Sequence, residues 1–291
     1  ASGTITQVIP PSLVLIVLAD QLGKSVGDMY LGAIGPSIAQ ILIFITFIML
    51  LSWFNPKLMP PQPKELRTRM GWPLVKKMMH GVLPSLGLIF IVLGTIFMGL
   101  ATPTEAGAMG VAGAIGLALS QRRFSWIMLW QGMDATMRVT VMVIFILIGA
   151  SVFTLVFQGV DGGVWVEHLF RVAGADDPVS FLIAVNIIIF ILAFFLDFFE
   201  IAFIVIPLLA PIATTLGIDL IWFGVYMVLM VEMSMVTPPV GLNLFIMQMM
   251  SGRSLAFVSK AVLPFFLIMV AFVIVLVAAP GLATYLPSVL F

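Results

Sequence analysis

Two adjacent prolines interrupt an apolar stretch of the sequence in Met233–Asn243, which reads MSMVTPPVGLN. Proline has no backbone N–H and clashes with the preceding turn, at a cost of about 3 kcal/mol in a helix interior. The break leaves upstream carbonyl groups without helical partners, and hydrocarbon cannot solvate them. Together with the hydroxyl group of Thr237, such carbonyls can form an oxygen cage for a small hard cation. The helix that restarts after the break directs its positive N-terminus at any neighbouring anion.

A second interruption of the same type lies near the start of the chain, at Pro10-Pro11. Alignment of the two proline pairs matches Thr6 with Ser234 and Ile9 with Thr237. Interrupted hydrophobic segments at corresponding positions of two halves indicate the binding site of a secondary transporter. Proline is also frequent in membrane helices, where it often produces only a kink. A purely structural kink therefore stays open as the alternative for each break.

Carboxylic side chains lie in or beside these apolar stretches at Asp197, Glu232 and Glu105. A carboxylate inside the membrane costs ~2.5 kcal/mol or more, which makes it a functional candidate. Asp197 equally fits a helix end at the membrane interface, and Glu232 a buried pairing with backbone or with another subunit. Glu105 fits a capping box, in which Thr102 is the N-cap residue and Glu105 occupies position N3.

The composition indicates an integral membrane protein. Of the 291 residues, 62% are hydrophobic and 9% are charged, whereas soluble domains contain about 25% charged residues. The formal net charge is zero, which argues against a nucleic-acid partner. The absence of cysteine excludes disulfides and thiolate metal sites. The chain opens without an initiator methionine or a basic signal region, so we expect it to be part of a longer protein.

Apolar stretches of about twenty residues predict membrane-spanning helices. Uninterrupted stretches lie at 36–53, 83–100, 139–157, 179–196 and 262–279. Interrupted stretches lie at 8–19, 101–119, 197–217 and 220–250. The spans and the two proline breaks together predict an all-α membrane protein in which broken helices carry the chemistry.

The connections between these spans differ in charge. The connection 54–80 is rich in Lys and Arg, and Arg122-Arg123 follow the next two spans. Basic residues are enriched in cytoplasmic loops, which places both connections on the cytoplasmic side. Residues 124–138 are amphipathic and contain Trp126 and Trp130, which predicts a helix lying along the cytoplasmic interface.

Five motifs occur in a characteristic order and spacing. They are GTITQVIPPSLVLIVLADQLGKSVGDMYLGAIGPS (3–37), GLATPTEAGAMGVAGA (99–114), FFLDFFEIAFIVIPLLAPIA (194–213), GIDLIWFGV (217–225) and TPPVGLNLF (237–245). Together they resemble the large membrane subunit of tripartite ATP-independent periplasmic (TRAP) transporters, over nearly the whole chain. The large subunits of this family extend further at the N-terminus, and their first hairpin, with its serine-rich cation motif, is not in this sequence.

The resemblance implies an inverted-repeat secondary transporter with interrupted helices and hairpins, similar to the ion-transporter superfamily and of the elevator type. The chain then divides into the end of the first repeat (1–53), a basic Pro-rich cytoplasmic loop (54–80), spans with the TPTE break and the interfacial helix (81–138), a second-repeat transport core with a hairpin (139–250) and a C-terminal span (251–291).

The resemblance also implies sodium-driven uptake of a small organic anion across the bacterial inner membrane. A periplasmic binding protein would deliver the substrate, and a small four-helix membrane subunit would complete the complex in the lipid bilayer. Sodium would be the coupling ion, with no other cofactor and no transition metal. The sequence has no G-x-x-x-x-G-K-[ST] motif, so the energy would come from an ion gradient. Proton coupling through Asp197 or Glu232 stays open.

Site residues follow from the resemblance position by position. The cation-binding residues are Gly3, Thr4, Thr6 and Ile9 at the first break, and Ala193, Ser234, Thr237 and Val240 at the second. The substrate-binding residues are Ser151, Asp197, Gly241 and Asn243, with Ser151 at the tip of a second hairpin. Structural or gating roles fall to Pro10, Pro11, Pro238, Pro239, Thr102 and Glu105. The chain departs from the family pattern at Thr6, Ala193 and Ser234, where glycine is usual. The small residues around Ser151 equally fit tight helix packing.

Two other functions remain open. A passive channel or a non-transporting structural subunit would share the same composition, and activity without a binding protein would favour the channel. An intramembrane hydrolase would need Ser151 as nucleophile with His168 as base, or a carboxylate pair of Asp197 and Glu232. Because the sequence has no oxyanion motif, we expect a protein that is not an enzyme. The residues do not define which organic acid is carried.

Overall fold

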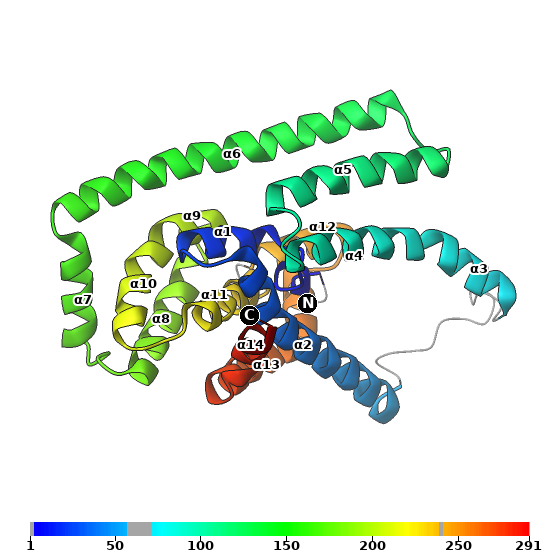
Figure 1. Ribbon diagram of the computed structural model, residues 1–291. Coiled ribbons are helices and arrows are strands. Elements are labelled where there is room, and N and C mark those ends of the chain that lie inside the picture. The colour runs from blue at the N-terminus through cyan, green and yellow to red at the C-terminus, as the bar shows by residue number, and fades with distance from the viewer. Residues whose placement is uncertain (1–2, 57–70, 239–240, 291) are drawn as a thin grey trace. The chain divides into compact units, whose positions relative to one another are not determined.

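The computed structural model describes residues 3–56, 71–238 and 241–290, which form helices joined by short turns (Figure 1). In chain order the elements are η1 (Ile5–Gln7), α1 (Leu13–Gln21), α2 (Val26–Phe54), α3 (Trp72–Gly81), α4 (Leu83–Phe97), α5 (Pro103–Ser120), α6 (Trp126–Gly159), α7 (Gly162–Val172), α8 (Pro178–Leu192), α9 (Phe198–Glu200), η3 (Ile201–Val205), α10 (Ile206–Thr215), α11 (Leu220–Met235), α12 (Leu242–Ser251), α13 (Leu255–Ala278) and α14 (Gly281–Leu290). Two compact units are present: a larger one of residues 1–44 and 140–291, and a smaller one of residues 45–139.

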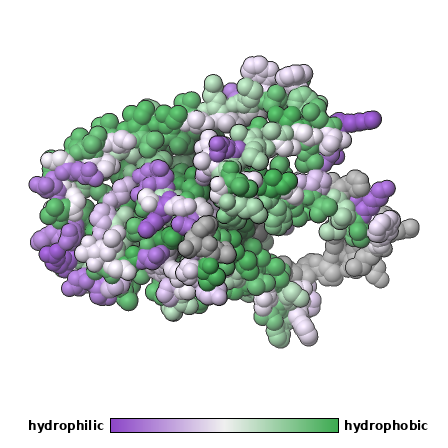
Figure 2. All heavy atoms as spheres, in the orientation of Figure 1, coloured by the Kyte–Doolittle hydropathy of each residue, from purple (hydrophilic) through white to green (hydrophobic). Residues whose placement is uncertain are grey.

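Several helices are long and apolar enough to cross a membrane. Among the described residues these are α2, α6, α13 and the continuous run Phe198–Thr215, while α4, α8 and α11 are shorter apolar helices. Hydrophobic side chains cover much of the face shown in Figure 2, whereas hydrophilic residues gather over α7 and the turn after it. For the residues that the structure describes, the predicted all-α membrane protein is therefore confirmed.

Helix α11 forms the centre of the larger unit (Figure 1). Its residues from Trp222 to Ser234 are all buried, and it contacts η1, α1, α8, α10, α12, α13 and α14. A glycine allows the closest approach between α2 and α14: a Cβ atom at Gly35 would lie 2.1 Å from the carbonyl oxygen of Leu282. A helix that is apolar on every side and surrounded by others is the expected core of a membrane protein.

Each uninterrupted span predicted from the sequence lies in a helix, with different ends. Helix α2 begins at Val26 and α13 at Leu255, well before the apolar stretches 36–53 and 262–279. Helix α8 stops at Leu192, and the turn that follows leads to Asp197. The C-terminal part contains α13, which is long enough to cross a membrane, followed by the short helix α14.

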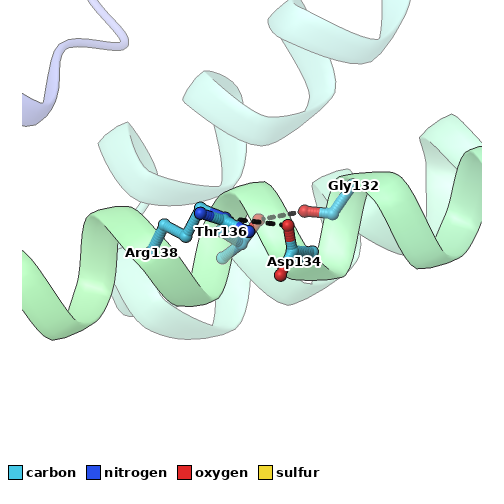
Figure 3. A network of polar contacts seen from close by, with 4 residues as sticks. All are labelled: Gly132, Asp134, Thr136 and Arg138. Atoms are coloured by element: carbon cyan, nitrogen blue, oxygen red, sulfur yellow. Dashed lines mark hydrogen bonds and ion pairs between the residues drawn. The ribbon is translucent and has the colours of Figure 1, made fainter.

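Residues 126–138 do not form a separate helix, because they are the first part of α6. Polar contacts on this part stay within the helix: Arg138 Nε lies 2.8 Å from Asp134 Oδ2, and Thr136 Oγ1 donates to the Gly132 carbonyl at 2.8 Å (Figure 3). Pairs three or four residues apart stabilise a helix locally, so these residues continue as helix into the apolar stretch that follows.

The run 197–217 changes helical register at η3, which is a π-helical turn. The N–H of Ile206 reaches back five residues to the carbonyl of Ile201. Pro207 follows directly and has no N–H to donate, so the regular ladder is interrupted at this point. Single π-helical turns within α-helices frequently accompany functional sites.

Candidate functional site

The second proline break separates α11 from α12. Two buried hydroxyl groups lie at the end of α11: Ser234 Oγ donates to the Val231 carbonyl at 2.6 Å, and Thr237 Oγ1 donates to the Met233 carbonyl at 2.8 Å. Both oxygens keep lone pairs that can face a cation. The predicted site residues Pro239 and Val240 lie outside the described part of the chain.

The backbone at this break is tightly folded. Pro238 cannot provide the N–H that the Ser234 carbonyl would receive in a continuous helix, and this carbonyl accepts the N–H of Thr237 at 3.1 Å instead. The Thr237 carbonyl accepts the N–H of Gly241 at 2.9 Å. A Cβ atom at Gly241 would lie only 2.6 Å from the Met235 carbonyl oxygen. Glycine at 241 therefore permits a compact turn rich in oxygen atoms.

The first proline break connects η1 with α1. Ser12 caps α1, and its Oγ also donates to the Gln7 carbonyl at 2.5 Å, which replaces a helical donor lost to proline. The Val8 carbonyl accepts Ser37 Oγ from α2 at 3.1 Å. Thr6 is exposed and its Oγ1 donates to the Gly3 carbonyl at 2.7 Å. The carbonyls of this break are thus held by hydroxyl groups, as at the second break.

The structure brings the two breaks together through side chains. Thr4 Oγ1 donates to Glu232 Oε1 at 3.1 Å, and Gln7 Nε2 lies 3.2 Å from Met235 Sδ. Gln40 Nε2 from α2 lies 3.2 Å from Glu232 Oε1 and 3.1 Å from its Oε2. Glu232 is 0% exposed. The segment before the first break is therefore fastened to the helix before the second.

The sequence patterns missed Gln40 and singled out Glu232 only as one of several carboxylates. A signal for Gln40 existed, because it is a polar residue inside an apolar span, and such residues usually face the protein interior. The pairing of Thr4 with Glu232 could not be found in this way, since 228 positions separate them.

The comparison with known families identifies the chain. The family model described as "Tripartite ATP-independent periplasmic transporter, DctM component" matches residues 1–282. The chain belongs to this family. It is a multi-pass membrane protein of the bacterial inner membrane, in agreement with its apolar helices. The resemblance noted in the sequence motifs is thereby confirmed.

Three relatives of this TRAP permease chain illustrate the similarity. It is 32% identical to the C4-dicarboxylate TRAP transporter large permease protein DctM of Pseudomonas aeruginosa, over 99% of this chain and 66% of that protein. It is 26% identical to the sialic acid TRAP transporter permease protein SiaT of Haemophilus influenzae, over 100% of this chain and 46% of that protein. It is 26% identical to the ectoine/5-hydroxyectoine TRAP transporter large permease protein UehC of Ruegeria pomeroyi, over 97% of this chain and 64% of that protein.

The chain thus spans about two thirds or less of the length of these relatives. The names of these relatives describe permeases of transporters, and none describes a hydrolase. Among the described residues, no group of three or more His, Asp or Glu side chains could hold a metal ion. The oxygen atoms that could act as cation ligands at the two breaks belong to carbonyl and hydroxyl groups. Such ligands suit a hard cation such as sodium.

Three carboxylates of the TRAP permease chain take part in helix caps. Asp197 is exposed and accepts the N–H of Phe198 at 2.6 Å, while Glu200 Oε2 accepts the N–H of Asp197 at 3.0 Å. Thr102 and Glu105 form the predicted capping box at the start of α5. The cap at Glu105 is thereby confirmed, and the helix-end alternative for Asp197 matches its observed contacts.

The remaining predicted residues have the following positions. Ser151 is exposed within the continuous helix α6 and donates to the Leu147 carbonyl at 2.7 Å, so its expected position at a hairpin tip was wrong. Ala193 is the C-cap of α8, which packs on α11. Asn243 is partly buried in the first turn of α12.

Proposed function

We propose that this TRAP permease chain carries out sodium-coupled secondary uptake of a small organic anion. The observation that carries the proposal is the meeting of the two proline breaks at α11, through the contact of Thr4 with Glu232. Interrupted segments that meet in pairs are typical binding sites of secondary transporters. The names of two relatives support an acidic substrate, since C4-dicarboxylate and sialic acid are organic acids.

The residues of the second break fit a sodium ion. Ser234 and Thr237 offer hydroxyl and carbonyl oxygens within one buried turn, and oxygen ligands suit hard cations. Sodium, when bound, supplies positive charge that offsets the negative charge of the substrate. The backbone N–H groups of Leu242 and Asn243, at the start of α12, would receive a substrate carboxylate. Gly241 keeps this helix start close to the oxygen-rich turn.

We further propose that the permease works with two partners and moves as an elevator. The family description, with its words tripartite and periplasmic, supports a small four-helix membrane subunit and a periplasmic binding protein that delivers the substrate. In the elevator mechanism the segments around both breaks move together past a scaffold. The contacts of Glu232 with Thr4 and Gln40 support joint movement of these segments.

The test is uptake of a radiolabelled organic acid into proteoliposomes that contain the complete complex and its binding protein. Thr237→Ala removes one hydroxyl ligand at the second break. We expect a sodium concentration for half-maximal uptake about tenfold higher than in the wild type, because loss of even an outer-shell partner typically costs about 10- to 100-fold in metal affinity.

Thr136→Ala is the matched control. Thr136 Oγ1 also donates to the carbonyl four residues earlier, at 2.8 Å, but on the exposed part of α6 (Figure 3). This variant should transport like the wild type. Uptake that ignores sodium in the wild type and is unchanged in Thr237→Ala would contradict the proposal. Uptake without sodium and without the binding protein would indicate a passive channel instead.

A further inference from the structure

The Glu232 carboxyl group lies at a junction of three chain segments that are distant in sequence. Thr4 precedes η1, Gln40 lies on α2, and Glu232 lies on α11. The exposed fractions of these three residues are 3%, 1% and 0%. Thr4 Oγ1 and Gln40 Nε2 lie 3.1 to 3.2 Å from the carboxylate oxygens of Glu232. The carboxyl group of Glu232 and the neutral polar side chains of Thr4 and Gln40 thus meet in the protein interior.

The charge of Glu232 has no basic counterpart in the described part of the chain. Ion pairs there join Arg138 to Asp134 and Arg171 to Glu167, and both pairs are exposed. The described basic side chains of the larger unit are all exposed; they are Lys24, Arg171, Arg253 and Lys260. Burial of a carboxylate without a positive partner is expensive. A bound cation would stabilise the charged form of this carboxylate.

The neighbouring oxygen atoms match what such a cation requires. Gln40 Oε1 is buried and accepts no hydrogen bond from the described residues. The oxygen and the NH2 group of an amide are nearly the same size. Rotation of the Gln40 side-chain amide by 180° would therefore place its oxygen, in place of its nitrogen, on the side of Glu232, where it could bind a cation. The Thr4 hydroxyl, which now donates to Glu232, can likewise turn a lone pair toward a cation.

We propose that Glu232, Gln40 and Thr4 bind one sodium ion, at a site separate from the residues of the second break. Of the cation-binding residues predicted at the first break, only Thr4 belongs to it, and Glu232 and Gln40 are new ligands. Glu232 supplies the negative charge, while the amide oxygen of Gln40 and the hydroxyl of Thr4 complete a set of hard ligands. A single carboxylate balances a single positive charge, which favours a monovalent ion over a divalent one. The role of this ion in transport rests on the proposed function, whereas its binding does not.

The experiment is equilibrium binding of radioactive sodium to the purified complete complex in lipid nanodiscs, with choline replacing sodium in the blanks. Glu232→Gln keeps the size of the side chain and removes its charge. We expect it to bind one sodium ion fewer per permease, or the same number with one site weakened about ten- to hundredfold. Glu167→Gln, on the exposed face of α7, is the matched control and should bind sodium like the wild type.

A second variant covers the case in which Glu232→Gln fails to fold. Gln40→Met keeps the shape of the side chain without its amide oxygen, and we expect sodium binding at this site to weaken several-fold. Equal stoichiometry and affinity in Glu232→Gln and in the wild type would overturn the site, as would unchanged binding in Gln40→Met when Glu232→Gln is unfolded. A wild type that binds this ion but takes up substrate without sodium would contradict the proposed function and leave the site standing.

Discussion

Alanine in place of Gly241 probes the turn between α11 and α12 directly. The added Cβ would lie 2.6 Å from the Met235 carbonyl oxygen and 2.9 Å from the Thr237 nitrogen, about 0.8 Å inside the ordinary contact distance of 3.4 Å in the first case. Both neighbours are backbone atoms, so no flexible side chain can give way. Overpacking of this kind costs about 1–3 kcal/mol, which corresponds to a fall in the melting temperature of about 2–12 °C.

The same displacement should weaken the proposed cation site. The Met235 and Thr237 backbones carry the oxygens of the turn, and ~1.4 kcal/mol of the strain would already raise the sodium requirement about tenfold. The assay combines thermal unfolding of the purified complex with the sodium dependence of uptake in proteoliposomes. In Gly241→Ala the melting temperature should fall, and the sodium concentration for half-maximal uptake should rise.

Gly149→Ala provides the matched control, because a Cβ there meets no atom within 4 Å and the residue lies within α6. Alanine is the better helix former by about 0.5–1 kcal/mol, so this variant should be as stable as the wild type or slightly more stable. If Gly241→Ala has the melting temperature and sodium dependence of Gly149→Ala, the close packing of the turn does not shape the site and the reasoning is refuted.

Two further predictions concern helix starts away from the breaks. Thr102→Ala removes the cap whose Oγ1 accepts the Glu105 N–H at 3.3 Å and should cost about 1 kcal/mol; an unchanged melting temperature would contradict a stabilising role of the capping box. At α8, hydrogen bonds from Ser180 and Val179 hold the pKa of Asp177 below its usual value. A lowered folded pKa stabilises the fold above the unfolded value of about 3.9 and loses this effect at lower pH. The stability difference between wild type and Asp177→Ala should therefore shrink below about pH 4, and a difference independent of pH would refute the charge effect.

The helices could be predicted from the sequence because their signals are local. Apolar length predicted α2, α4, α6, α8 and α13, and the Thr102 to Glu105 spacing predicted the cap of α5. Local signals also misled: residues 124–138 are amphipathic and predict a separate interfacial helix, yet residues 126–138 are the first part of the continuous helix α6. A polar helix segment has no stop signal unless a proline, a glycine or a cap follows, and none of these lies between 138 and the apolar stretch.

The candidate site could be predicted only in part. The proline pairs identified both breaks, because proline acts on its own backbone whatever surrounds it. The partners of Glu232 could not be predicted, since Gln40 and Thr4 lie 192 and 228 positions away. Ser151 illustrates the opposite error. The small residues Gly149 to Ser151 suit a hairpin tip and a helix equally well, and here they are helical.

The contacts of Glu232 have a consequence for movement within the permease. A buried carboxyl group that loses its hydrogen bonds incurs the full desolvation cost. Any shift of Thr4 or Gln40 relative to α11 would break bonds of 3.1 to 3.2 Å to this group. The segment before the first break, α2 at Gln40 and α11 are therefore expected to move as one body. The proposed elevator movement requires such a body, because the proposed sodium ligands would have to keep their geometry while the substrate is carried across the membrane.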